Sequence, residues 1–256
     1  MAINKESNGY IFGFSAVLVI LVGALLATLS IVLKPFQKKN VEEEKMQNIL
    51  QAIGVDVSRS EAAKEFGVYV KKQLVLNFEG KVISEDAFGV DIQKEYKSLA
   101  SPAERQYPLY VCEKQGQTFY VIPLIGTGLW GPIWGFIALG EDKNTVQGAV
   151  FDHKTETPGL GAEITEASFY NQFLGKKLAD AKGFVSIHVV KPGSEELGNH
   201  SVNGITGGTL TSVGVDEMLG RILGVYYRYF EANKTTMPVA SEEMEQEPLN
   251  TAEYGA

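Results

Sequence analysis

The segment Asn203-Gly204-Ile205-Thr206-Gly207-Gly208-Thr209-Leu210-Thr211-Ser212 places three glycines and four hydroxyl side chains directly before a strongly helical stretch. From Val215 to Phe230, apolar residues recur at i, i+3, i+4 and i+7 spacing, which predicts a helix packed on a sheet. A glycine-rich turn before a helix suits a bound phosphate, because the backbone can come close and the first N–H groups of the helix are unpaired. The same residues are typical of an ordinary Ser/Thr N-cap, so the segment alone leaves both interpretations open.

The sheet under this helix is expected from two hairpins earlier in the chain. Leu109–Glu113 and Thr118–Ile122 form the first hairpin, and Phe136–Leu139 and Val146–Asp152 form the second. Further elements are helices at Ser60–Gln73 and Glu166–Leu174, strands at Gln73–Phe78, Lys81–Ser84 and Val185–Val190, and a loop or short helix at Asp91–Arg105. Hairpin strands pair antiparallel, so the predicted fold class is α+β, with an antiparallel sheet and packed helices.

A single N-terminal transmembrane helix is predicted from Ile11 to Leu33. These 23 residues carry no charge and, as a helix, would be about 35 Å long, which is enough to span a bilayer. The apolar run is too long for the h-region of a cleaved signal peptide. Lys34, Lys38 and Lys39 follow the span, so the positive-inside rule alone places the large C-terminal part in the cytoplasm.

The chain is expected to comprise five parts. An amphipathic pattern from Gln37 to Ile53, ended by Gly54, predicts a stalk that leaves the membrane. After Asn233 the composition shifts to Pro, Glu, Ser and Thr, which predicts an acidic flexible tail. The parts are an N-terminal segment (1–10), the transmembrane helix (11–33), the stalk with an accessory α/β segment (34–105), a ligand-binding domain (106–233) and the tail (234–256).

Composition narrows the classes of partner and site. A net charge of −8 and a pI near 5.1 argue against nucleic acid as a partner, because a polyphosphate requires a concentrated Lys/Arg surface. Cys112 is the only cysteine, so no internal disulfide and no thiolate cluster are expected. His153, His188 and His200 lack the spacing of metal ligands. We therefore expect neither a protein-ligated metal nor a nucleic-acid site.

The glycines at 126, 128 and 131 match the dinucleotide-binding fingerprint, but that motif requires a helix after its third glycine. Pro132 and Gly135, with aromatic and β-branched residues between them, predict strand and turn instead. Trp130 and Trp134 then either contact a flat ligand or pack in the core, and the sequence leaves these alternatives open. Together with the turn-rich loop at 153–161, the chain has three Gly/Thr-rich segments suited to facing a ligand.

Three motifs in order carry a resemblance to a known family: Gly128-Leu-Trp-Gly-Pro-Ile-Trp-Gly135, Glu156-Thr-Pro-Gly-Leu-Gly161 and Gly204-Ile-Thr-Gly-Gly-Thr209-Leu-Thr-Ser212. The chain resembles the C subunit of bacterial sodium-translocating NADH:quinone reductases, and the G subunit of the Rnf complex is a sister family. Both carry an FMN-binding domain. The stalk and the tryptophan-containing motif fit the sodium-pump subunit better than the Rnf subunit.

The resemblance implies FMN esterified through its phosphate to Thr209 by an external flavin transferase. The flavin would relay electrons from NADH toward quinone, coupled to sodium export by the whole complex, with the NADH and quinone sites on other subunits. The flavin ring would lie between the Glu156–Gly161 loop and the Trp130 region. The residues implied for cofactor binding are Thr206, Gly207, Gly208, Leu210, Thr211, Ser212, Glu156, Thr157, Leu160, Gly161 and Trp130.

Two positions depart from the family pattern, which usually has an acidic residue at Asn203 and an alanine at Gly208. The resemblance also implies a single-pass protein of the bacterial inner membrane, with its flavin domain on the periplasmic face, against the lysine count. No general base or nucleophile is expected in the chain, since the flavin supplies the redox chemistry. The alternatives are an Rnf-type electron-transport subunit and a membrane-anchored scaffold without redox function.

Overall fold

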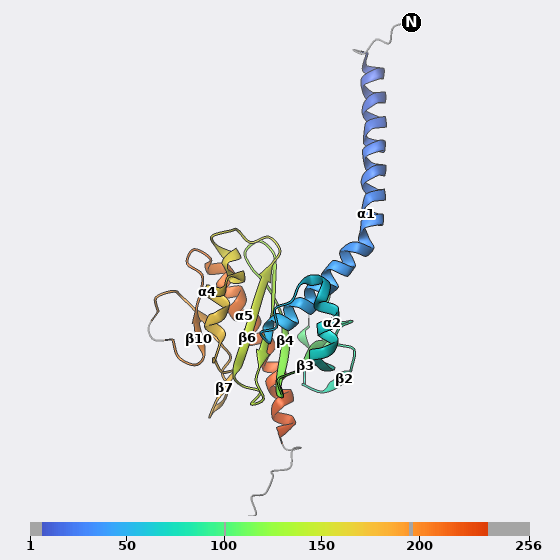
Figure 1. The fold of residues 1–256 in the computed structure, drawn as a ribbon. Helices are drawn as coiled ribbons and strands as arrows, with labels where there is room; N and C mark the ends of the chain where they lie inside the picture. Colours follow the sequence, from blue (N-terminus) through green and yellow to red (C-terminus); the bar gives the residue numbers. More distant parts are fainter. Residues whose placement is uncertain (1–6, 100, 195–196, 235–256) are drawn as a thin grey trace, which may run out of the picture.

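A computed structural model describes residues 7–99, 101–194 and 197–234, and Figure 1 shows a long N-terminal helix rising from a domain built around one sheet. The helices are α1 (Asn8–Ala52), α2 (Arg59–Tyr69), α3 (Ile92–Ser98), α4 (Ala167–Tyr170) and α5 (Thr209–Ala232), with 3-10 turns η1 (Pro102–Glu104), η2 (Gly161–Thr165) and η3 (Asn171–Phe173). The strands are β1 (Val70–Leu76), β2 (Val82–Ser84), β3 (Tyr107–Lys114), β4 (Gln117–Thr127), β5 (Pro132–Leu139), β6 (Val146–His153), β7 (Ala179–Asp180), β8 (Gly183–Phe184), β9 (His188–Val190) and β10 (Ser201–Asn203).

The main sheet has six strands in the order β2-β1-β3-β4-β5-β6, and every neighbouring pair is antiparallel. The two predicted hairpins, β3–β4 and β5–β6, lie side by side in this sheet, which confirms the predicted α+β class with an antiparallel sheet. Strands β1 and β2 join the same sheet through β1–β3 pairing. The expected division at residue 105 therefore falls between two strands of one sheet.

Helices cover both faces of this sheet. Alternate residues of β4 point to opposite sides, as strand geometry requires. Ile122 and Leu124 pack in the core under α5, whereas Val121 packs in a second core with the end of α1 and with α2. Cys112 of β3 is buried in this second core, and burial raises the pKa of its thiol to about 12. The sheet and the first of these cores thus fix α5, whose first residue is Thr209.

The predicted transmembrane segment and stalk are one continuous helix, α1, of 45 residues that contains Pro35. Its apolar N-terminal part is exposed, and among the described residues α1 is the helix long and apolar enough to cross a membrane. Its last turn buries Ile49 and Leu50 on the sheet. At Gly148 of β6, an added Cβ would lie 2.2 Å from the Ala52 carbonyl oxygen, so this glycine lets the helix end lie directly on the strand.

Several predicted boundaries were wrong, because tertiary pairing overrides local propensity. The helix expected at 60–73 ends at Tyr69, because the next residues pair with β3 as strand β1. The helix expected at 166–174 is a single turn of α4 followed by η3. Only His188–Val190 of the strand expected at 185–190 is extended, and it pairs parallel with β10. The tail beyond Lys234 and residues 1–6 lie outside the described residues.

The fingerprint glycines lie in the β4–β5 hairpin, and a strand, not a helix, follows the third glycine, as the sequence predicted. Strand β4 continues through Gly126 and Thr127, and the Gly128 N–H donates to the Gly131 carbonyl at 2.8 Å to close the turn. Strand β5 follows at Pro132, where a dinucleotide-binding motif would begin its helix. The turn therefore lacks the helix of a dinucleotide-binding motif.

Candidate functional site

Thr209 is the first residue of helix α5 and is exposed. Gly208 occupies the N-cap position, and in the described structure no side chain caps this helix. The Ser212 hydroxyl, a candidate cap, instead accepts the Ile205 N–H at 2.9 Å, which holds the preceding turn. The first N–H groups of a 24-residue helix and its partial positive charge are thus available beside the Thr209 hydroxyl. This arrangement suits an anion better than it suits a simple Ser/Thr cap.

The two glycines before Thr209 bring the loop at 156–161 against this turn. Gly207 has a φ of +77°, and an added Cβ there would lie 2.7 Å from a methyl carbon of Leu160. At Gly208, an added Cβ would lie 2.9 Å from Ile205 Cβ and 3.3 Å from the Gly161 backbone nitrogen. At Gly207 the positive φ disfavours any other residue, and at Gly208 an added Cβ would require Ile205 to shift, so the two glycines favour this shape of the turn.

Glu156 joins the three glycine-rich segments. Glu156 is 5% exposed. One of its carboxylate oxygens accepts a hydrogen bond from the backbone N–H of Trp130 at 2.8 Å, and the other accepts one from the Thr211 hydroxyl at 2.6 Å. An added Cβ at Gly128 would lie 2.6 Å from the first oxygen, and one at Gly161 would lie 2.4 Å from the second. The glycines of two segments therefore make the space that the carboxylate fills.

The residues named from the sequence divide into two groups. Thr211, Ser212, Gly208, Gly161 and Glu156 are buried and form the framework of the site. The other group is exposed on the same three segments: Thr206, Gly207, Thr209, Leu210, Thr157, Leu160 and Trp130, together with Leu129 and Val213. Trp130 is 64% exposed and is therefore no core residue. Exposed apolar side chains of this kind, beside a turn that suits an anion, can contact a flat ring.

A groove beside this turn contains residues that the sequence did not indicate. It has a volume of about 420 Å³ and is lined by Glu163 and Gln172 opposite Ile205 and Thr206. The Gln172 amide donates to the Asn203 carbonyl at 3.3 Å and accepts the Asn203 N–H at 2.9 Å. The Asn203 side-chain oxygen is buried and, in the described structure, has no hydrogen-bond partner. Gln172 has no periodic or motif signal, so only the fold reveals its place.

Replacing Glu156 by Gln is expected to reduce the free energy of unfolding by about 1–2 kcal/mol, because two charge-assisted hydrogen bonds become neutral ones. Glu163→Gln is the matched control, since Glu163 is less buried and its carboxylate accepts only the Gly159 N–H among the described contacts. Its expected change is within about 0.5 kcal/mol. Urea unfolding of the detergent-solubilised chain measures both. Equal effects of the two variants would contradict the joining role of Glu156.

Comparison with known proteins gives a consistent set of similarities. Residues 128–224 match the FMN-binding domain family, a range that contains the three motifs at 128–135, 156–161 and 204–212. The chain is 31% identical over 228 residues to the C subunit of the Na(+)-translocating NADH-quinone reductase of Haemophilus ducreyi, covering 83% of this chain and 88% of that one. The corresponding protein of Pseudomonas aeruginosa is 32% identical over 244 residues, covering 86% and 93%.

Solved structures of such proteins have the same fold. The crystal structure of the corresponding C subunit from Parabacteroides distasonis matches with a TM-score of 0.71 and 45% identity, covering 77% of this chain and 96% of that one. NqrC of Shewanella oneidensis matches with a TM-score of 0.62 and 26% identity, covering 75% and 99%. This chain therefore belongs to the family of the C subunits of Na(+)-translocating NADH-quinone reductases.

Proposed function

We propose that this chain carries FMN esterified through its phosphate to Thr209 and relays electrons within a sodium-translocating NADH:quinone reductase. The observation that supports this most directly is the exposed Thr209 hydroxyl at the uncapped start of α5. A phosphodiester at this oxygen would lie beside the first N–H groups and the positive end of the helix dipole. A flavin transferase is the expected partner that forms the ester bond.

The turn before Thr209 fits a phosphate because Gly207 takes a positive φ, which lets the backbone come close to a ligand. Glu156 holds Thr211, two residues after the attachment point, to the loop that carries Leu160. The attachment point and the loop therefore stay in fixed relation. The role proposed for Glu156 is thus to position the site, since both of its carboxylate oxygens already bond to protein donors.

The exposed apolar side chains of Trp130, Leu160 and Leu210 are proposed to contact the isoalloxazine ring. When bound, the flavin supplies the one-electron chemistry, so the chain needs no general base or nucleophile of its own. Its residues bind the phosphate, fix the position of the ring and shield one side of it from water. The NADH and quinone sites are proposed to lie on other subunits.

Helix α1 fits a single pass through the inner membrane as part of a membrane complex. We place the flavin domain on the periplasmic face, as the resemblance implies. Lys34, Lys38 and Lys39 oppose this orientation, but three lysines are a modest bias, and the other subunits of a complex can constrain the orientation of one helix.

Intact-mass spectrometry tests the proposal. Coexpression of the full chain with a flavin transferase is expected to add the mass of one FMN less one water, and denaturing gels are expected to show a flavin-fluorescent band at the mass of the chain. Expression without the transferase is the control and should give the unmodified mass. If neither the mass nor the fluorescence appears with the transferase present, the covalent cofactor is disproved and the scaffold alternative is favoured.

A further inference from the structure

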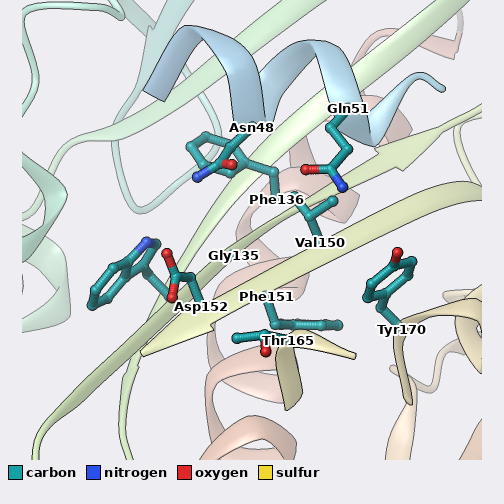
Figure 2. A pocket seen from close by; sticks show the side chains of 10 residues that line it. Asn48, Gln51, Gly135, Phe136, Val150, Phe151, Asp152, Thr165 and Tyr170 are labelled. Atoms are coloured by element: carbon teal, nitrogen blue, oxygen red, sulfur yellow. The ribbon is translucent and has the colours of Figure 1, made fainter. Parts of the chain in front are cut away.

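A second site lies on the opposite face of the sheet from α5, where the last turn of α1 leaves one end of β5 and β6 uncovered. A cavity of about 240 Å³ is bordered there by Asn48 and Gln51 of α1 and by Trp134, Phe136, Asp152 and Tyr170. Figure 2 shows Asn48 and Gln51 reaching from α1 toward the sheet, with Asp152 and Tyr170 on opposite sides of the opening. Trp134 and Asp152 are direct partners across the β5–β6 ladder.

The polar groups around this cavity have hydrogen-bonding capacity that the protein does not use. Across the described ranges, no hydrogen bond or ion pair involves the side chains of Asn48, Gln51 or Tyr170. The Asp152 carboxylate accepts only the backbone N–H of its neighbour His153, at 2.7 Å. Among the described residues, no basic side chain pairs with this carboxylate. Lys45, one turn earlier on α1, does not supply the missing charge, because its ammonium donates to the Phe88 and Val90 carbonyls.

The chemistry of the lining selects a cation with several donors. A carboxylate, two amide oxygens and a phenol oxygen provide acceptors, and Trp134, Phe136 and Tyr170 provide aromatic surface. A guanidinium combines five N–H donors with a flat face that stacks on aromatic rings. An anion would meet the like charge of Asp152, and a neutral ligand would leave that carboxylate without a counter-ion.

We propose that this cavity binds the guanidinium of an arginine side chain from a neighbouring subunit. Asn48 and Gln51 belong to the same helix as the membrane anchor, so a side chain bound here would fix the flavin domain relative to the membrane part of the complex. The inference that the cavity binds a guanidinium rests on the lining of the cavity alone. The inference that this guanidinium comes from a neighbouring subunit rests on the proposed function. The two inferences are tested separately.

Trp134 reports on binding. Trp130→Phe leaves Trp134 as the single tryptophan, and the solubilised chain prepared without flavin avoids quenching by the cofactor. We expect N-acetyl-arginine amide to change the Trp134 fluorescence saturably, and the citrulline analogue, which is uncharged and nearly the same shape, to leave it unchanged.

In Asp152→Asn the affinity for N-acetyl-arginine amide should fall at least about tenfold, since the ion pair is lost. Asp56→Asn, at an exposed position that makes no described contact, should bind like the parent chain. An equal response to citrulline, or unchanged affinity in Asp152→Asn, would overturn the site.

The neighbouring-subunit source is tested in the whole complex. Asp152→Arg is expected to reduce copurification of the other subunits, while flavin attachment at Thr209, on the opposite face of the sheet, continues at the wild-type level. Normal assembly of the Asp152→Arg complex would show that no arginine docks there. Loss of attached flavin in the wild-type complex would instead count against the proposed function and leave the fluorescence result intact. If Asp152→Arg loses both attached flavin and assembly, the double variant Asn48→Leu/Gln51→Leu is tested in its place. Normal assembly of the double variant would also show that no arginine docks in the cavity.

Discussion

Replacing Thr209 by Ala is expected to abolish covalent flavin binding and to leave the fold intact. The hydroxyl oxygen is the only atom of this side chain that can form the proposed ester. In the described structure it makes no hydrogen bond, so its removal costs the fold little. Alanine is also a better helix former than threonine at the start of α5. The expected change in unfolding free energy is within about 0.5 kcal/mol, whereas the flavin-fluorescent band and the added mass are lost completely.

Two variants control for this result. Thr206→Ala removes another exposed hydroxyl three residues earlier and should slow flavin attachment without abolishing it, because Thr206 is implied in cofactor binding but does not supply the ester oxygen. Thr209→Ser restores a hydroxyl at the same position and should regain attachment, although at a lower rate if the transferase requires the threonine methyl group. Attached flavin in Thr209→Ala would place the ester at another residue, and loss in Thr206→Ala would show that the whole turn, and not one hydroxyl, determines attachment.

The sequence was most informative where local pattern and tertiary structure agree. The periodicity from Val215 to Phe230 predicted α5, and the hairpin patterns predicted strands β3 to β6, because each buries one continuous apolar face. Local pattern failed where pairing decides the structure. Residues 70–73 read as the end of a helix, yet their backbone bonds go to β3. Gly126 and Thr127 read as a loop, yet they complete β4 against β5.

The sequence predicted which segments form the candidate site, but not the contacts that hold these segments together. The three glycine-rich segments could be named from the sequence, because glycine and hydroxyl residues are poor core formers wherever they occur. The role of Glu156 could not, since its partners are 26 and 55 residues away along the chain, at Trp130 and Thr211. The cavity at Asn48 and Asp152 was also hidden, because it forms only where the end of α1 stops short of the end of the sheet.

Gly214→Ala is expected to destabilise the protein strongly, because helix α5 crosses β4 at this glycine. An added Cβ would lie 2.1 Å from the Thr127 carbonyl oxygen and 3.3 Å from a methyl carbon of Ile133. The first obstacle is backbone on a paired strand, so it cannot turn aside as a flexible side chain would. Overpacking of this kind costs about 2–3 kcal/mol, which outweighs the gain of roughly 1 kcal/mol from replacing glycine in a helix.

Gly220→Ala is the matched control on the same helix, because an added Cβ there meets nothing within 4 Å. This variant should be stabilised by up to about 1 kcal/mol, so the two substitutions are expected to have opposite signs in urea unfolding. Gly214 lies five residues after Thr209, and α5 can relieve the clash only by moving away from Thr127. That movement would separate Thr211 from Glu156 and slow flavin attachment in Gly214→Ala, while Gly220→Ala is modified at the wild-type rate. If Gly214→Ala and Gly220→Ala had the same stability and the same rate of flavin attachment, the prediction would be wrong. Close contact between α5 and β4 would then not set the geometry of the proposed phosphate site at Thr209.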